Sequence, residues 1–436
     1  MRKVAVARIL MFAAGLALFA SAGSASTYYV DAQRGNNANG GTADSPWQTI
    51  QKAADSAQPG DTVMVAEGDY AERIQVTRSG AAQRPISFEA RGKALTEGFT
   101  IVADYIRVVG FEITSQITLP RDSYGVSLQG QYDEIVNNYI HDIYHDGIMV
   151  GGPGHHLIKG NRIYRANNCG ISVSGRENLI EDNEVSHTIQ YPTGGPAWGG
   201  ADADGMRFFG SDNVFRGNHI HDIVMSDLGN LDPHIDCFQT WGPATNMTFE
   251  QNVCDLGGSA SMIENSSGAV HHLLYRNNIF IQTGPLNIHN NPARGNIAFL
   301  QVLNNTFYRL GGSALFLQGD LTDVTIENNA FFDVGGHRQS YLSRTGAASW
   351  EGWTVGYNLQ SMSDGQSPGG SQAPHPHDLV GVDPQFVNAA GKDFRPTATS
   401  PLVGSGVELK EVKTDIAGKP RPQGAGYDIG AYEYQR

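Results

Sequence analysis

The chain has 436 residues and a formal net charge of −14, from 44 acidic and 30 basic side chains. An acidic protein is repelled by phosphate backbones and by anionic lipid headgroups, so the charge excludes nucleic acid and membrane surfaces as expected partners. Glycine is abundant, at 53 residues, and helical heptads are absent, which favours short strands and tight turns.

Residues 1–26 have the pattern of a secretory signal peptide. Arg2, Lys3 and Arg8 form a basic start, an apolar stretch follows over residues 9–20, and small residues suited to cleavage come next. The apolar stretch is too short to cross a bilayer, so we expect export to the medium or the periplasm. Removing three of the 30 basic residues leaves 27 against 44 acidic ones, a net charge of −17 for the mature chain.

The mature chain is predicted to begin with a strand at residues 28–31 and a short amphipathic helix over 46–54. A turn and a further strand are expected over 57–70. The open end of a stack of parallel strands would pair with other chains, so we expect the helix to cap that end.

Between residues 124 and 331 one pattern recurs: an apolar strand, a gap, then Asn and a second apolar patch. The strands begin at Tyr124, Asp146, Cys169, Asp204 and Asp236, with weaker copies from Ser261, Pro285 and Ser313. The recurring asparagines are Asn138, Asn161, Asn183, Asn218, Asn252, Asn278, Asn305 and Asn329. Most repeats span 22 to 28 residues, which is one turn of a solenoid. We therefore expect an all-β parallel β-helix over 27–333 and an irregular C-terminal extension over 334–436 that packs on its end.

Two repeats are about ten residues longer than the others, because Gly170 to Gly205 spans 35 residues and Gly205 to Cys237 spans 32. The extra segments, 187–203 and 224–235, are predicted to form loops that wall a cleft beside one strand. Neutral surface decoration is the alternative.

Alternation of strand side chains predicts which residues point out of the coil. The outward set is Ser127, Met149, Ser172, Arg207, Gln239, Glu264, Asn287 with His289, and Phe316. We predict that Arg207, Gln239 and Glu264 share one exposed column in the cleft. Arg207 and Glu264 are candidate catalytic residues, and the candidate substrate-binding residues are Gln239, His289, Trp198 and Trp241.

Acidic residues cluster at the starts of two neighbouring strands. Asp202, Asp204, Asp232 and Asp236 would repel one another unless a cation or a proton were shared among them. Calcium, which prefers oxygen ligands, fits an exported protein. Turn capping by Asp204 and Asp236 is equally compatible with the pattern. Asp236 is also a candidate catalytic carboxylate.

His234, in the run Asp232-Pro233-His234, is a candidate acid or base, and a solvated loop histidine is the alternative. The chain has three cysteines, Cys169, Cys237 and Cys254. The repeat that begins at Asp204 lies between Cys169 and Cys237. We therefore expect buried packing rather than a bridge between these two.

Both ends of the mature chain resemble secreted right-handed parallel β-helix proteins of the pectate-lyase-like group. The matching segments are Tyr28 to Asp31, Gly41-Thr42, Trp47 to Ala54, Pro59 to Tyr70, Asp383 to Val387, Ser400 to Val403, Thr414 to Arg421 and Asp428 to Tyr434. The opening is most similar to the family 9 pectate lyases. The resemblance implies a right-handed β-helix and an exported polysaccharide-degrading enzyme.

The same resemblance implies a catalytic Lys beside a calcium ion, but no Lys lies between Lys159 and Lys392. The role of base would then fall to Arg207 or His234. The Asp232 to His234 run is also similar to the site motif of alginate C5-epimerases, although Ile235 follows it in place of an acidic residue.

The favoured function is therefore a monomeric, secreted polysaccharide lyase that cleaves a uronic-acid polymer by β-elimination. A glycoside hydrolase is the alternative, since Asp204, Asp236 and Glu264 fall in three consecutive repeats, and carboxylates on adjacent coils can approach the ~5 Å separation of retaining enzymes. An epimerase and a non-catalytic carbohydrate-binding protein are lesser alternatives.

Overall fold

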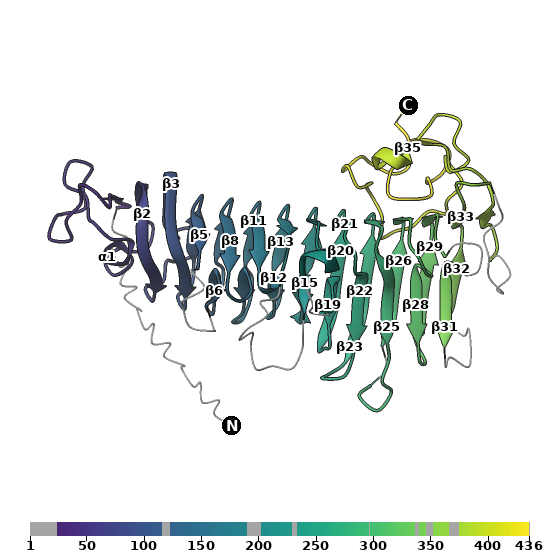
Figure 1. Cartoon of the computed structure of the whole chain (residues 1–436), viewed down its shortest axis with the longest axis horizontal. Coiled ribbons are helices and arrows are strands. Elements are labelled where there is room, and N and C mark those ends of the chain that lie inside the picture. The colour runs from purple at the N-terminus through teal and green to yellow at the C-terminus, as the bar shows by residue number, and fades with distance from the viewer. Residues whose placement is uncertain are drawn as a thin grey trace, which may run out of the picture.

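The computed structural model describes residues 24–115, 123–189, 202–228, 233–295, 297–335, 340–345, 352–365 and 375–435. Figure 1 shows them as an elongated stack of short strands, with the C-terminal residues lying over one side near the far end. The predicted signal peptide falls mainly in residues 1–23, outside the described ranges. None of the helices in the described part of the chain is long and apolar enough to span a membrane.

Each coil of the stack contributes strands to three parallel sheets. The first sheet contains β1 (Thr27–Val30), β2 (Thr62–Val76), β3 (Ile86–Ile101), β4 (Ile106–Val109), β7 (Glu134–Val136), β10 (Leu157–Lys159), β13 (Leu179–Glu181), β17 (Val214–Arg216), β20 (Ala244–Glu250), β23 (Val270–Arg276), β26 (Ala298–Leu303), β29 (Thr322–Glu327) and β32 (Trp353–Gly356). The short β16 (Gly210–Ser211) pairs with the start of β20.

The second sheet continues from β3 through β5 (Glu112–Thr114), β8 (Tyr139–Ile143), β11 (Arg162–Ala166), β14 (Glu184–Ser186), β18 (His219–His221), β21 (Val253–Asp255), β24 (Ile279–Ile281), β27 (Thr306–Tyr308), β30 (Ala330–Phe332), β33 (Leu359–Ser361) and β34 (Leu379–Val380). The third contains β6 (Val126–Leu128), β9 (Ile148–Val150), β12 (Asn168–Val173), β15 (Ala203–Phe208), β19 (Asp236–Thr240), β22 (Ser259–Glu264), β25 (Gly284–His289), β28 (Leu315–Gln318) and β31 (Leu342–Thr345).

Strand alternation places the core as predicted. In the third sheet Ile148, Val150, Met206 and Phe208 are fully buried, and they line up with one another in parallel register from coil to coil. Burying each such side chain stabilises the fold by roughly 1.5–3 kcal/mol. The all-β parallel β-helix is confirmed.

The recurring asparagines form the predicted ladder. The Nδ2 of Asn138, for example, donates to Oδ1 of Asn161 at 3.0 Å, and the same contact repeats up to Asn358. The side chains are buried, and each also donates to a backbone carbonyl of the preceding coil, such as Asn161 Nδ2 to Ile135 O of β7 at 2.8 Å. These asparagines are scaffold because they satisfy buried backbone groups coil after coil.

A second buried ladder runs through Asp133, His156, Asn178 and Asn213. Burial raises the pKa of Asp133 to about 8 and lowers the pKa of His156 to about 4, so both side chains are neutral in the folded protein near pH 7. The carboxyl Oδ2 of Asp133 lies 3.5 Å from Nδ1 of His156.

Replacing Asp133 with Asn should flatten the stability profile of the protein above pH 6.5. Because the pKa of Asp133 is raised in the folded protein, stability falls as pH rises from 3.8, the ordinary value for Asp, towards 8. The lowered pKa of His156 makes stability rise with pH, but only up to 6.5, the ordinary value for His. Wild type should thus lose about 1–3 kcal/mol by pH 8, and Asp133→Asn should not. Melting curves of both proteins at several pH values test this, and parallel profiles would contradict it.

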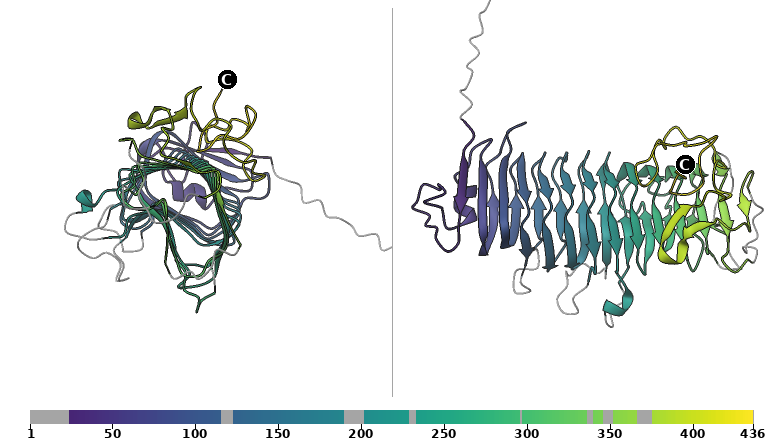
Figure 2. Two further views of the ribbon diagram at one scale, coloured as in Figure 1. Left: turned by 90° about the vertical axis from the view of Figure 1, so that its right-hand side faces the viewer. Right: turned by 90° about the horizontal axis from the view of Figure 1, so that it is seen from above.

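The N-terminal cap is a single short helix, α1 (Ile50–Ala54), as predicted. Its first amides, those of Ile50 and Gln51, donate to the carboxylate of Glu72 at 2.7 and 3.0 Å. Ile50, Ala53 and Ala54 are buried against the first coil. The end-on view in Figure 2 shows the helix lying across the opening of the coil.

The stack is longer than predicted. Strands β31 to β34 continue the three sheets as far as Val380, beyond the expected boundary at residue 333. The repeat is hidden in the sequence because the segments between these strands vary in length, which obscures the period.

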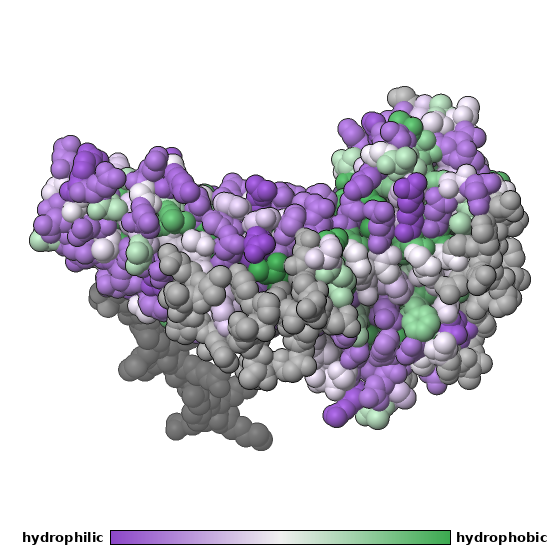
Figure 3. Space-filling model, viewed as in Figure 1, coloured by the Kyte–Doolittle hydropathy of each residue, from purple (hydrophilic) through white to green (hydrophobic). Residues whose placement is uncertain are grey.

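The C-terminal extension, which includes β35 (Phe386–Asn388), η2 (Ala389–Gly391) and β36 (Asp393–Pro396), lies along the second sheet. Ile279, Ile281, Tyr308 and Phe332 of that sheet form a second apolar core with Phe394 and Ala431. Figure 3 shows a mostly hydrophilic surface, with hydrophobic residues visible where the extension meets the stack.

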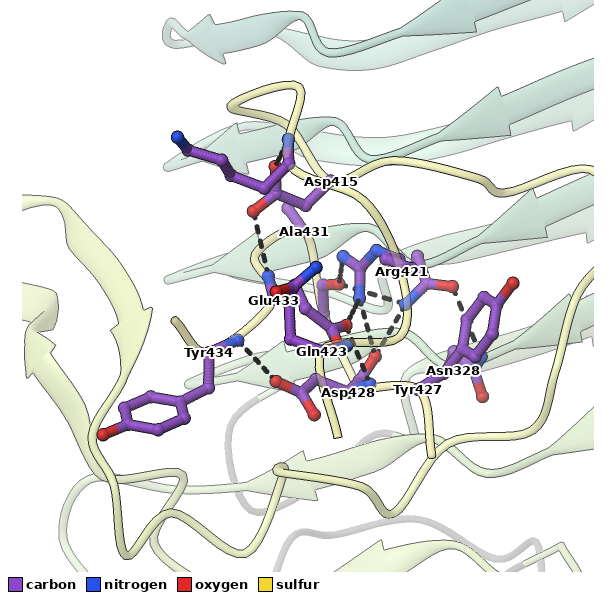
Figure 4. A network of polar contacts seen from close by, with 12 residues as sticks. Asn328, Asp415, Arg421, Gln423, Tyr427, Asp428, Ala431, Glu433 and Tyr434 are labelled. Carbon is purple, nitrogen blue, oxygen red and sulfur yellow. Dashed lines mark hydrogen bonds and ion pairs between the residues drawn. The ribbon is translucent and has the colours of Figure 1, made fainter. Parts of the chain in front are cut away.

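In four successive coils the residue before the ladder asparagine holds the extension. Gln251, Asn277, Asn304 and Asn328 all have positive φ, and their side-chain amides donate to extension carbonyls at 2.7–2.8 Å. Figure 4 shows the buried polar network that organises the extension itself, centred on Arg421 and Glu433. The extension therefore covers the side of the stack near its C-terminal end, and not the end alone as predicted (Figure 1).

Cys237 is bridged to Cys254, with their Cα atoms 6.1 Å apart, and Cys169 is a buried free thiol. The expectation that Cys169 and Cys237 are not bridged to each other is confirmed, but the pairing of Cys237 with Cys254 was not predicted. That expectation considered neighbouring strands of one sheet, whereas the bridge joins β19 of the third sheet to β21 of the second sheet within one coil.

Candidate functional site

The outer face of the third sheet carries a polar tract where the two long loops leave the coil. Parallel pairing places Ser172, Arg207, Gln239, Met262 and Asn287 at equivalent positions of successive coils. In two adjacent coils an Asp lies three residues before the outward residue, Asp204 before Arg207 and Asp236 before Gln239.

Arg207 is the centre of the tract. Its Nε donates to Asp204 Oδ2 at 2.8 Å and to Gln239 Oε1 at 3.1 Å. Its Nη2 donates to Asp202 Oδ2 at 2.7 Å and to Asn168 Oδ1 at 3.1 Å. Burial alone would lower the pKa of Arg207, but the nearby carboxylates, Asp204 foremost, raise it above its ordinary value. The guanidinium is therefore a fixed positive charge and does not act as a base.

Asp204 and Asp236 lie beneath the surface, at 0% and 1% exposure. Asp204 Oδ1 accepts from the Asp236 amide at 3.1 Å, and Asp236 Oδ2 accepts from Gln239 Nε2 at 3.2 Å. Asp204 is the buried ionic partner of the Arg207 guanidinium, and burial raises the pKa of Asp236 to about 6. Asp236 is covered by its neighbours, and it holds Gln239 in place. The predicted catalytic role of Asp236 required direct contact with a ligand, which this burial opposes.

His234 is the exposed titratable group of the site. Its backbone pairs with that of Asp202, and its Nδ1 lies 3.8 Å from Asp202 Oδ1. The imidazole is 63% exposed, whereas the Asp202 side chain is 17% exposed. Asp202 thus lies between His234 and Arg207, and its Oδ2 accepts from Arg207 Nη2 at 2.7 Å.

The predicted exposed column of Arg207, Gln239 and Glu264 is wrong in two respects. Arg207 and Gln239 are largely buried, at 7% and 5% exposure, and Glu264 lies outside their column. Met262 occupies the next position in that column, and Glu264 pairs with His289 one row farther along the strands. Glu264 lies two residues beyond Met262 on the same strand. An offset of two residues keeps the side chain on the outer face of the sheet but moves it to the next row along the strands. Glu264 Oε1 lies 3.7 Å from His289 Nδ1, and His289 Nε2 contacts Asn287 Oδ1 at 2.9 Å.

Trp241 borders the tract immediately after β19. Its ring lies 5.5 Å from the guanidinium carbon of Arg207 and packs edge-on against Phe209 at 4.7 Å. It is 36% exposed, so part of the ring is available to a ligand. The other predicted platform, Trp198, and the predicted metal ligand Asp232 lie outside the described residues.

The tract extends towards the N-terminus through residues that were not predicted. Asn168 Nδ2 donates to Asp146 Oδ1 at 2.6 Å, and Asp146 contacts Nδ1 of His145 at 3.0 Å. Tyr124 packs on the His145 ring with centroids 4.6 Å apart. The recurrence of Asp-Gly at the starts of the strands at 146 and 204 was the signal available in the sequence.

The candidate calcium ligands that are described do not fit a calcium ion. Both oxygens of Asp204 and one of Asp202 are engaged by Arg207 or by a backbone amide. Across the described ranges, no group of three or more His, Cys, Asp or Glu side chains is arranged to hold a metal. The positive charge next to Asp202 and Asp204 comes from Arg207, whereas the sequence had led us to expect a bound cation there.

The fold and the tract define the class of the protein: a parallel β-helix with a polar site on the outer face of one sheet. The chain belongs to the Pel9A-like family of right-handed β-helix proteins, whose family model matches residues 28–254.

Solved structures resemble the chain at low sequence identity. Pectate lyase Pel9A is 16% identical, with a TM-score of 0.57 over 95% of this chain and 97% of that one. The lacto-N-biosidase from Eubacterium ramulus is 14% identical, with a TM-score of 0.46 over 76% of this chain and 67% of that one.

A curated relative, the uncharacterized protein YwoF of Bacillus subtilis (strain 168), is 29% identical over 142 residues. The match covers 32% of this chain and 29% of that protein, so the chain spans less than a third of the relative's length.

Proposed function

We propose that the protein is a secreted or periplasmic polysaccharide lyase that cleaves a uronic-acid-containing chain by β-elimination on the third sheet. Family membership and the likeness of fold to a pectate lyase support a polysaccharide substrate. The observation that carries the proposal is the connected set His234, Asp202 and Arg207, which joins an exposed imidazole to a fixed cation beneath Trp241.

The substrate carboxylate would lie at Arg207, whose positive charge makes the proton on the adjacent carbon more acidic. His234 would take that proton, the freed electron pair would form a carbon–carbon double bond, and the glycosidic oxygen would leave at the next carbon. Glu264, paired with His289, lies along the same face and would assist departure of that oxygen. Trp241 and Gln239 would hold the sugar ring.

The test is product analysis on a panel of acidic and neutral polysaccharides. A lyase forms new chain ends together with the ultraviolet absorbance of an unsaturated uronate. New ends without absorbance would replace the proposal with a hydrolase. Neither signal on any acidic polymer would leave a non-catalytic binding protein as the better account.

A glycoside hydrolase is the second candidate. The raised pKa of Asp236, about 6, is the property of a general acid, and Asp204 lies in the adjacent coil. The burial of both carboxyl groups, at 0% and 1% exposure, counts against direct contact with a glycosidic bond. An epimerase would use the same proton abstraction and would release no new chain ends.

Chelation should leave activity unchanged, because both oxygens of Asp204 and one of Asp202 already accept hydrogen bonds and are not open to a metal ion. The measurement is the initial rate on the best acidic polymer, before and after EDTA treatment and gel filtration. Loss of the rate, with recovery on adding calcium, would restore the calcium hypothesis and require Asp232 or another group outside the described residues as a ligand.

A further inference from the structure

A groove lies on the outer face of the first sheet, on a different side of the coil from Arg207. Its volume is about 440 Å³, and it crosses the coils of β20, β23, β26 and β29. One side is formed by His272, Phe299 and Asp323, and the other by Thr248, Gln301 and Thr325.

The first of these sides is a ladder of left-handed backbone positions. Asn246, His272, Phe299 and Asp323 occupy equivalent places in successive coils, with φ between 55° and 58°. Asn and Asp adopt this conformation readily, whereas a bulky residue such as Phe does so at a cost of order 1–3 kcal/mol. The backbone conformation alone therefore does not favour Phe at position 299.

The ring of Phe299 is presented to solvent instead of filling the core. It is 45% exposed and stacks on His272, with centroids 4.2 Å apart and an interplanar angle of 16°. In the adjacent row, the outward side chains of Thr248, Gln301 and Thr325 offer hydroxyl and amide groups. An aromatic face beside hydrogen-bonding groups suits a sugar, whose apolar face stacks while its hydroxyls pair.

The charge of the groove selects among sugars. Among the described residues that line it there is no Lys or Arg, and Asp323 contributes a negative charge. A uronate would be repelled there, particularly on a chain with a net charge of −14. A neutral glycan meets no such repulsion.

We propose that this groove binds a neutral glycan chain, independently of the site on the third sheet. Such a site would hold the protein on a neutral polysaccharide. The inference rests on the first sheet alone and does not require the lyase proposal.

Calorimetric titration with cellohexaose, β-1,4-galactohexaose and hexagalacturonate tests the proposal. At least one neutral hexasaccharide should bind, and Phe299→Asn and His272→Asn should each weaken that binding about 10-fold. Asn suits the left-handed backbone, as Asn246 shows in a neighbouring coil, so both variants should melt at or above the wild-type temperature.

Tyr132→Asn is the matched control. Tyr132 occupies the same ladder, with φ of 59° and 39% exposure, but it stacks between Tyr105 and His155 far from the groove. This variant and His234→Asn should keep full neutral-glycan affinity. No binding of either neutral hexasaccharide, binding that survives Phe299→Asn, or tighter binding of hexagalacturonate than of the neutral sugars at the groove would each overturn the proposal.

Discussion

Replacing His234 with Asn should lower kcat on an acidic polysaccharide by about 10²–10⁴-fold, the usual contribution of a positioned general base. Asn keeps a polar side chain of similar reach but takes up no proton. Because His234 is 63% exposed and its contact with Asp202 is 3.8 Å long, the variant should fold with wild-type stability. The measurements are the initial rate of unsaturated product formation and the melting temperature.

His219→Asn is the control for this prediction, since His219 is an exposed histidine on the second sheet. It should retain wild-type kcat. A His234→Asn variant that keeps most of its activity would remove His234 from the mechanism. The proton would then have to be taken by another group along the tract, such as the Glu264–His289 pair.

Replacing Arg421 with Ala should destabilise the protein by about 3–5 kcal/mol, as expected when one partner of a buried ion pair is lost. Arg421 Nη1 donates to Glu433 Oε2 at 2.9 Å, and both side chains are inaccessible to solvent. Its Nη2 donates to Gly430 O at 2.8 Å and to Asn277 Oδ1 at 3.3 Å, which ties the extension to the stack. Figure 4 shows how these contacts converge.

Denaturant unfolding of Arg421→Ala measures this effect, with Arg395→Ala as its control. Arg395 also pairs with an acidic residue of the extension, Asp393, but its side chain is 63% exposed. Loss of an exposed pair should change stability by less than about 1 kcal/mol. Equal losses for the two variants would show that the Arg421 network contributes no more than a surface contact.

The sequence was sufficient for the fold because the signal repeats. From Asn138 onwards each coil carries inward apolar residues and a ladder asparagine, so neighbouring coils support the same interpretation. The same periodicity located Arg207 and Gln239 next to each other, as the register confirms. It could not resolve the coils after residue 333, where segments of variable length interrupt the period.

The finer arrangement of the site depended on positions that periodicity does not determine. The placement of Glu264 required the exact register, and an offset of two residues leaves the inward and outward pattern unchanged. The bridge from Cys237 to Cys254 crosses the interior of one coil, a contact that spacing along a single sheet does not reveal. The partners of Arg207 likewise come from three strands and a loop end, which only the folded chain brings together.

The most direct test of the account is a crystal structure of His234→Asn soaked with a uronate oligosaccharide. We expect a sugar ring against Trp241, its carboxylate within hydrogen-bonding distance of Arg207, and position 234 facing the carbon that loses its proton. An oligosaccharide bound on another face of the coil, or one whose carboxylate avoids Arg207, would contradict the placement of the reaction on the third sheet.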